Sequence, residues 1–394
     1  MKHIFQLPNE TDREISYLLS LAIKIKSHLL SFDLLQVISA GLLIIFGSTF
    51  IYSAGQHVGG SMTTAWEKQI MWVLVGYAIW LILSHMNYNI LGIIAPIFYL
   101  ITVLLLVMIF FIGVKVYGAR RWLDFGGLRI QPSEFAKVSS LLLISYLASQ
   151  KKFKINKVSY LLGLFILTAI PFVLVLKEPD LGSSLVFIVI FVTVVFCAKV
   201  SWKWILVVTV ACIIVVPGIY PFLHDYQKER ILVFFDPERD PMNQGWTSRQ
   251  TLLSVGSGGF SGKGLLQGTQ NTLGFLPQSV SNSDLIFSVI AEESGFIGSL
   301  FMIIMYGLLI FSMMRTAFFA KDQFGYLFAS GAAMMFFEHL YINIGMNIRL
   351  MPITGIPLPL ISYGGSFMLS SMICLGILQS IYMRQKYNNY TKIG

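Results

Sequence analysis

The stretch NYNILGIIAPIFYLITVLLLVMIFFIG, residues 87–113, carries no acidic or basic side chain. A hydrocarbon core about 30 Å thick needs about 20 apolar residues per helix, so this stretch predicts a membrane helix that is tilted or continues beyond the bilayer. The whole chain of 394 residues is similar, because 56% of it is hydrophobic and only 12% is charged. This charged fraction is about half of the roughly 25% that is typical of soluble domains. The mean hydropathy of the chain is also high, at +0.73. The sequence therefore predicts an integral membrane protein.

Ten apolar windows predict an all-α polytopic membrane protein with ten transmembrane helices. The windows are 34–55, 68–85, 87–113, 133–149, 157–176, 181–199, 202–222, 285–314, 323–345 and 363–383. Residues 223–284 form a long polar interval and are expected to be a loop between the seventh and eighth helices. The expected organisation is a tail over 1–33, a membrane domain over 34–384 and a second tail over 385–394.

Basic side chains in short loops predict how the chain crosses the membrane, because cytoplasmic loops carry an excess of Lys and Arg. One set of turns and the C-terminal tail hold Lys151, Lys152, Lys154, Lys157, Lys199, Lys203, Arg315, Lys321, Arg384, Lys386 and Lys392. We therefore expect both termini in the cytoplasm and residues 223–284 outside. This accounts for much of the net charge of +9 without a nucleic-acid partner. The outer side holds nearly as many cations, which indicates either an anionic ligand or internal ion pairs and contacts with membrane lipids.

The spacing of other residues gives no sign of common cofactor sites. Cys197, Cys212 and Cys374 lie in separate predicted spans, so they predict neither a disulfide framework nor a metal site. The six histidines form no HExxH or comparable cluster, and GSGGFSGKG, residues 256–264, does not follow a strand as a nucleotide-binding loop would. Residues 1–33 lack the pattern of a signal peptide.

Asp284 ends the polar interval, and no other carboxylate lies between Pro241 and Leu285. It stands beside several cations at the start of a predicted membrane helix, which makes it a candidate for chemistry. An N-cap is the structural alternative, because helix starts prefer Asp and gain roughly 1 kcal/mol from it.

Two short motifs place charges where ordinary connectors would not. Glu134 and Lys137 follow Pro132 in a helix-entry signal, so they form either a simple i,i+3 ion pair or part of a site. Lys137 falls inside the predicted helix, where a cation without a partner costs about 2.5 kcal/mol or more. Asp180 in KEPDLGSS, residues 177–184, is either an N-cap of the sixth helix or a site residue.

Two further outer segments are rich in glycine or proline. The glycines of 256–264 permit positive φ and close backbone approach, so their amides and Lys263 are candidates for binding an anion. NIRLMPITGIPLPLISYGGS, residues 347–366, contains three prolines. It is expected to be irregular backbone that lines a cavity or is buried in protein.

Four ordered motifs together resemble one family of membrane proteins. They are RRWLDFGGLRIQPSEFAK (120–137), EPDLGSS (178–184), GSGGFSGKGLLQGTQ with SDLIF (256–270 and 283–287) and TGIPLPLISYGGS (354–366). On these motifs the chain resembles the SEDS (shape, elongation, division and sporulation) family, with PDLG and GIPLP closer to its RodA branch than to its FtsW branch. The resemblance implies a peptidoglycan glycosyltransferase that polymerises lipid II at the outer face of the bacterial cytoplasmic membrane, working with a class B penicillin-binding protein.

The resemblance also implies roles for individual residues, and the family's essential acidic residue maps to Asp284. The other polar site positions map to Trp122, Glu134, Lys137, Asp180 and Arg230. This chain departs from the family pattern between Pro277 and Asp284, where it is two residues longer. Gln278 and Ser283 also replace the commoner Glu and Thr, and Arg349 occupies a position that is usually small. These departures concern the path of the loop rather than the identity of the acid.

Sugar polymerisation requires a base for the acceptor hydroxyl and stabilisation of a departing diphosphate. We expect Asp284 to take the proton from the 4-hydroxyl of the acceptor GlcNAc, which attacks the anomeric carbon of the donor MurNAc with inversion. A base of this kind contributes about 10²–10⁴-fold. The candidates for offsetting the diphosphate charge are Arg120, Lys137, Arg230 and Lys263. The scheme requires no cofactor, and a divalent cation such as magnesium would serve the same purpose as these side chains.

Two alternatives come from other functional classes. A lipid II flippase needs ionisable groups at bilayer depth, and Glu292 and Glu293 in the eighth predicted helix are the best candidates, unless they only make interhelical hydrogen bonds. A scaffold that only recruits a penicillin-binding protein would leave Asp284 dispensable. The concentration of most other charges at one face favours an enzyme.

Overall fold

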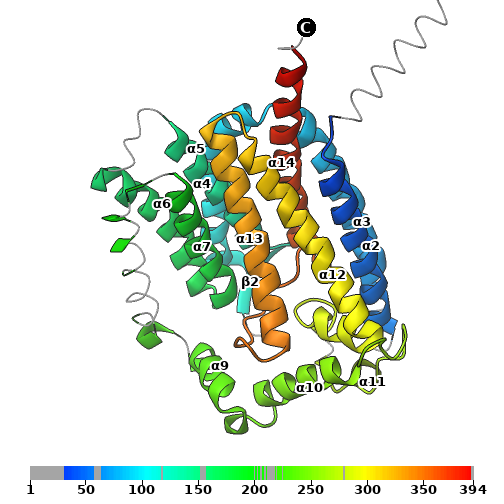
Figure 1. The fold of residues 1–394 in the computed structure, drawn as a ribbon. Coiled ribbons are helices and arrows are strands. Elements are labelled where there is room, and N and C mark those ends of the chain that lie inside the picture. Colours follow the sequence, from blue (N-terminus) through cyan, green and yellow to red (C-terminus); the bar gives the residue numbers. More distant parts are fainter. Residues whose placement is uncertain are drawn as a thin grey trace, which may run out of the picture.

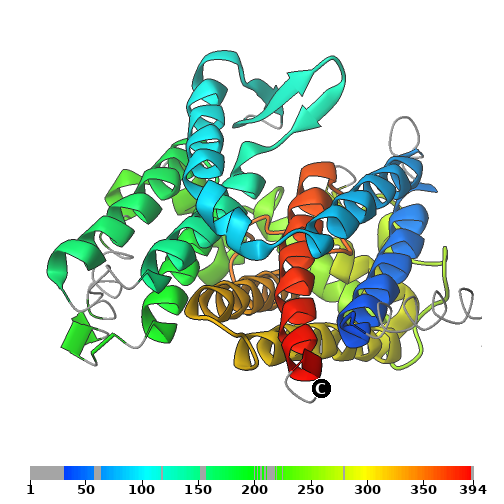
Figure 2. The same cartoon turned by 90° about the horizontal axis from the view of Figure 1, so that it is seen from above.

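The computed structural model describes residues 31–391 except 57–63, 117–118, 151–156, 278–279 and, between 199 and 224, positions 199, 202, 205, 208–209, 211–217, 219 and 224. Its long helices are α2 (Leu34–Gln56), α3 (Ala65–His85), α4 (Tyr88–Ile112), α5 (Pro132–Ser149), α6 (Val158–Lys177), α7 (Leu181–Cys197), α12 (Ile286–Phe318), α13 (Gln323–Asn347) and α14 (Gly365–Thr391). They pack into one bundle, seen from the side in Figure 1 and from above in Figure 2. The mostly helical, polytopic fold is as expected.

Nine of the ten predicted windows coincide with these helices. Among the described residues, six helices are long and apolar enough to cross a membrane: α2, α3, α4, α6, α12 and the part of α14 over Gly365–Gln385. α5 and α13 are less apolar but lie in the interior of the bundle, where most of their residues are buried. The tenth window, 202–222, lies largely outside the described residues.

Local sequence sets several helix ends and one helix break. Asn87 caps α4, and Asp322 caps α13 by accepting a hydrogen bond from the Gly325 amide at 2.7 Å. Pro132 occupies the first turn of α5, where its missing N–H costs nothing. Within α12, Gly295 has φ 64° and ψ −159°, a region essentially confined to glycine.

The glycine-rich segment 256–264 fills the break in α12. Its backbone supplies partners for amides and carbonyls on both sides of Gly295, which an interrupted helix leaves without intrahelical bonds. The bonds run from Lys263 N to Glu292 O, Gly264 N to Glu293 O, Phe296 N to Gly259 O and Ile297 N to Phe260 O, at 2.9–3.1 Å. The structure thus gives these glycines a role different from the expected anion cradle, because the amides of 263 and 264 donate to α12.

A three-stranded antiparallel sheet connects α4 to α5 and was not part of the all-helical expectation. Its order is β1 (Val114–Val116), β2 (Ala119–Phe125) and β3 (Leu128–Ile130). Gly126 and Gly127 make the turn from β2 to β3 with φ of 68° and 96°, as two-residue hairpin turns with positive φ require. Neighbouring side chains along β2 point to opposite faces.

Residues 223–284, expected as a loop, contain the helices α9 (Asp225–Phe235), α10 (Gln244–Ser257) and α11 (Thr269–Thr272). Figure 1 shows them at the end of the bundle opposite to the C-terminus of α14. At the C-terminal end, Arg315 of α12 pairs with Asp33 before α2 and lies over the Tyr382 ring of α14. The start of α2 and the end of α14 therefore share one end of the bundle. That this end is cytoplasmic stays a prediction of the charge distribution.

Candidate active site

Asp284 lies two residues before the start of α12, and side chains of α13 bind its backbone. Its carbonyl accepts hydrogen bonds from the side-chain amides of Asn343 at 2.9 Å and Asn347 at 3.4 Å. The N-cap position of α12 is Leu285, and no side chain makes a capping hydrogen bond there. The carboxylate of Asp284 is therefore not used to cap the helix.

The carboxylate of Asp284 faces Gly355 and Arg230, which comes from α9. A Cβ on Gly355 would lie 3.1 Å from Asp284 Oδ2 and 4.0 Å from Arg230 Nη1. Gly355 has φ of 77°, a conformation that glycine adopts without strain. Arg230 Nη1 also donates to the carbonyl of Thr354 at 3.2 Å. The irregular segment after α13 thus brings a carboxylate and a cation together across a residue without a side chain.

Asp180 approaches the same segment from the start of α7. Its Oδ1 accepts a hydrogen bond from an amide in the first turn of α7 at 3.1 Å, so the predicted capping role is confirmed. Its Oδ2 lies 3.6 Å from Nη1 of Arg121, and Nε of the same Arg121 donates to the carbonyl of Glu178 at 3.2 Å. A Cβ on Gly182 would lie 2.9 Å from the carbonyl oxygen of Thr354. The turn between α6 and α7 therefore packs against the segment that faces Asp284.

Burial and nearby charges together bring the pKa of the Asp284 carboxyl close to neutral pH. Burial raises its pKa to about 7, Arg230 opposes this rise, Asp180 adds to it and Arg121 opposes it. A carboxylate with a pKa near the working pH is well matched to general-base chemistry. Burial also raises the pKa of the Glu178 carboxyl to about 9, so Glu178 is neutral at pH 7 and adds no negative charge to this region.

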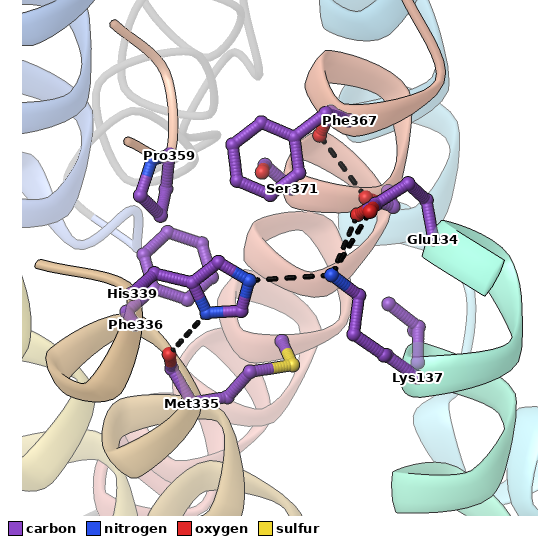
Figure 3. Close-up of a pocket in the computed structure, with 10 residues that line it drawn as sticks. Glu134, Lys137, Met335, Phe336, His339, Pro359, Phe367 and Ser371 are labelled. Atoms are coloured by element: carbon purple, nitrogen blue, oxygen red, sulfur yellow. Dashed lines mark hydrogen bonds and ion pairs between the residues drawn. The ribbon is translucent and has the colours of Figure 1, made fainter. Parts of the chain in front are cut away.

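Glu134, Lys137 and His339 form a second cluster, in a cavity between α5, α13 and α14 (Figure 3). Lys137 Nζ lies 2.9 Å from Oε2 and 3.0 Å from Oε1 of Glu134, and 3.2 Å from Nε2 of His339. All three residues are buried. The predicted i,i+3 ion pair is confirmed, and it gives the intramembrane cation a partner. The rest of the cavity is lined by Val138, Met335, Phe336, Pro359, Phe367, Ser370 and Ser371.

Lys263 joins a third polar cluster with the two glutamates of α12. Its Nζ lies 2.6 Å from Glu292 Oε1, and Glu293 accepts a hydrogen bond from Ser53 Oγ of α2 at 2.6 Å. Both carboxylates are buried and partnered. Glu292 and Glu293 therefore make polar contacts with other segments, which was the structural alternative to a role in lipid transport. The ion pair between Lys263 and Glu292 attaches the glycine-rich segment 256–264 to α12.

Arg120 and Trp122 lie on β2, on either side of Arg121. Arg120 is exposed, and its Nη1 donates to the carbonyl of Phe110 at 3.5 Å. Trp122 is partly exposed and is paired with Val114 of β1. Because successive residues of a strand point to opposite faces, only Arg121 of this trio reaches the α6–α7 turn.

Sequence reasoning missed Arg121, Glu178, His339 and Gly355 as members of these clusters. The strand that distinguishes Arg121 from Arg120 was not predicted, so nothing separated two adjacent arginines. His339 belongs to no metal-binding pattern, and its partner Lys137 is distant in sequence. Within the described part of the chain, no group of three or more His, Cys, Asp or Glu side chains is arranged to hold a metal ion. We therefore assign no residues to a divalent cation.

Comparisons with known proteins agree with the motifs. The family model for the cell cycle proteins FtsW, RodA and SpoVE matches residues 28–387. The peptidoglycan glycosyltransferase MrdB of Escherichia coli is 36% identical over 346 residues, which are 87% of this chain and 91% of that protein. A probable peptidoglycan glycosyltransferase FtsW of Trichlorobacter lovleyi is 34% identical over 368 residues, covering 90% and 93% of the two chains.

Solved structures give the same result. A chain from a peptidoglycan synthase complex, described as coordinating polymerization and crosslinking, matches with a TM-score of 0.76 and 28% identity. The rod shape determining protein RodA of Thermus thermophilus matches with a TM-score of 0.65 and 26% identity. Each match covers 90% of this chain and 98% of the other. From its motifs, its fold and these matches, the chain belongs to the FtsW/RodA/SpoVE family of multi-pass membrane proteins.

Proposed function

We propose that this protein is a peptidoglycan glycosyltransferase that polymerises lipid II at the outer face of the bacterial cytoplasmic membrane, with both termini in the cytoplasm. The names of its relatives support the reaction. The synthase complex among its structural neighbours supports a partnership with a class B penicillin-binding protein. The similarity to MrdB and RodA favours a role in cell elongation and shape.

In this proposal Asp284 is the general base. It removes the proton from the 4-hydroxyl of the acceptor GlcNAc as that oxygen attacks the anomeric carbon of the donor MurNAc. The bond to the diphosphate oxygen breaks with inversion, and the undecaprenyl diphosphate leaves with the bonding electron pair. Arg230 is the cation that faces Asp284, and Lys137 is the buried cation of the cavity between α5, α13 and α14. Both are candidates for offsetting the charge of the diphosphate.

The assignment of Asp284 as the general base rests on the environment and the pKa of its carboxylate. Asp284 does not cap α12, its backbone is fixed by two asparagines, and burial raises its pKa to about 7. Its carboxylate faces Arg230 across Gly355, a residue without a side chain. A half-buried carboxylate with this pKa suits a base that must meet a substrate.

The flippase alternative is disfavoured by the contacts of its best candidates. Glu292 binds Lys263 and Glu293 binds Ser53. These contacts connect α12 to the glycine-rich segment 256–264 and to α2. They fit the hydrogen-bonding role that was the structural alternative for the two glutamates. The scaffold alternative predicts that Asp284 can be neutralised without effect, which an experiment decides.

The test is lipid II polymerisation by the purified protein with its penicillin-binding partner, whose own transpeptidase site has been inactivated. Asp284→Asn keeps the shape of the side chain and removes the base, so we expect a loss of about 10²-fold or more. Asp236→Asn makes the same chemical change at an exposed residue before Pro237 and should leave the rate unchanged. Normal polymer from Asp284→Asn would refute the base assignment. No polymer from the wild-type complex would favour the flippase or scaffold.

A further inference from the structure

We propose that His339 is a positioning residue that holds the ammonium group of Lys137 in the cavity between α5, α13 and α14, where it meets the diphosphate of the lipid substrate. This inference rests on the proposed function and deepens it. His339 comes from α13, whereas Glu134 and Lys137 come from α5 (Figure 3). The position of the Lys137 ammonium group therefore depends on how α5 and α13 pack against each other.

The hydrogen bonds of His339 determine which ring nitrogen carries the proton. Nδ1 lies 2.7 Å from the carbonyl oxygen of Met335, and a carbonyl only accepts, so Nδ1 must donate. Nε2 lies 3.2 Å from Lys137 Nζ, and an ammonium only donates, so Nε2 must accept. The ring is therefore neutral, with its proton on Nδ1 and its lone pair directed at Lys137. The α13 backbone fixes this arrangement, because Met335 is one helical turn before His339.

The ammonium of Lys137 is held from several directions. Both carboxylate oxygens of Glu134 contact it on one side, and His339 Nε2 contacts it on the other. The ring of Phe367 lies beside it, with 5.5 Å between Nζ and the ring centroid. Glu134 alone would draw the ammonium along α5, toward its own carboxylate. The lone pair of His339 supplies the second point that directs it toward α13 and the cavity.

A packing role for His339 is the competing explanation, and it predicts a different order of variants. The imidazole ring stacks on Phe367, with centroids 5.5 Å apart and an interplanar angle of 26°. If stacking and volume were what mattered, His339→Phe would preserve function better than His339→Gln. If the acceptor matters, the order is reversed, because the Gln amide oxygen can accept from Lys137 and a phenyl ring cannot.

The first experiment measures lipid II polymerisation by the complete complex containing His339→Phe or His339→Gln. Hydrogen bonds to charged groups are stronger than those between neutral groups, so we expect His339→Phe to lose about tenfold or more in kcat/KM. His339→Gln should retain most of the activity. Tyr341→Phe, at an exposed position of α13, is the matched control and should behave as wild type. Activity in His339→Phe equal to or above that in His339→Gln would overturn the inference.

The second experiment separates this inference from the proposed reaction by measuring binding alone. Undecaprenyl diphosphate is titrated into nanodiscs that hold wild type, His339→Phe, Lys137→Met or the double variant. If His339 acts through Lys137, then His339→Phe weakens binding in the wild-type background and has no further effect once Lys137 is Met. Equal weakening in both backgrounds would show that His339 acts independently and would overturn the proposal. A wild type that binds but makes no polymer would count against the proposed reaction alone.

Discussion

Gly355 has no side chain to fill the space between the Asp284 carboxylate and Arg230, so we expect it to leave room for a substrate there. A methyl group there would lie 3.1 Å from Asp284 Oδ2, and the φ of 77° would cost an L-residue roughly 1–2 kcal/mol. We expect Gly355→Ala to lower polymerisation strongly while the protein still assembles with its partner. Gly307→Ala in α12 is the control, since nothing lies within 4 Å of its added methyl group. The comparison requires rates and thermal unfolding of both variants, and equal rates would show that Gly355 does not shape the site.

Arg230 is one of the groups that influence the protonation of Asp284. Burial raises the pKa of Asp284 to about 7, and Arg230 opposes that rise. Replacing Arg230 with Met removes the opposing charge, so the pKa rises further and a larger fraction of Asp284 is protonated at pH 7. We therefore expect the acidic limb of the rate profile to move to higher pH, with a larger loss at pH 6.5 than at pH 8.5.

The pH profile of Arg230→Met is compared with those of two matched variants. Arg230→Lys keeps the positive charge and should leave the limb closer to its wild-type position. Arg239→Met removes a cation from an exposed pair with Glu229 and should not move it. A limb that stays in place in Arg230→Met would show that a group other than Asp284 controls the reaction.

At the scale of elements, one ion pair joins three helices at the end of the bundle opposite to α9–α11. Asp33 is fully buried before α2 and binds Arg315 and Ser312 of α12, while Arg315 lies over Tyr382 of α14. Arg315→Met leaves a buried carboxylate without its cation, which costs on the order of 1–3 kcal/mol. We expect a clear fall in the thermal unfolding temperature and little change in the rate per folded molecule.

Arg129→Met tests whether this loss depends on burial. Arg129 pairs with Asp124 on the hairpin, where its side chain is 56% exposed, and exposed pairs contribute about 0–1 kcal/mol. We therefore expect little change in unfolding temperature from this substitution. A similar fall in unfolding temperature for Arg129→Met and Arg315→Met would mean that the burial of Asp33 does not strengthen its ion pair with Arg315.

The elements that sequence predicted well are those whose signal is local. Windows such as 87–113 contain enough apolar residues to define a helix by themselves, and Asp180 was recognised as a possible cap from its position alone. The hairpin at 114–130 was missed, because its short strands alternate weakly and its motif was read as a loop before a helix. The filling of the α12 break by residues 258–264 depends on segments that are separated in sequence and meet only in the folded bundle.

The same distinction applies to the site. Asp284, Glu134 and Lys137 could be selected because their charges are out of place in a membrane protein. Their partners Arg230 and His339 come from other helices, and no regular spacing links them. Arg230 was reached through the family resemblance, and His339 was not reached at all.

At the scale of the whole molecule, the start of α2 and the end of α14 share one end of the bundle, and α9–α11 lie at the other (Figure 1). The positive-inside rule predicts that the first end is cytoplasmic, which is the orientation that a base acting on an externally displayed lipid would require. In a variant without the native cysteines, we introduce one cysteine at Ser261 or at Lys321, both exposed positions. A membrane-impermeant maleimide should label Ser261→Cys in intact cells and Lys321→Cys only after the membrane is permeabilised. The reverse pattern would place Asp284 on the cytoplasmic side, where polymerisation outside the cell could not use it, and the proposed function would fail with the topology.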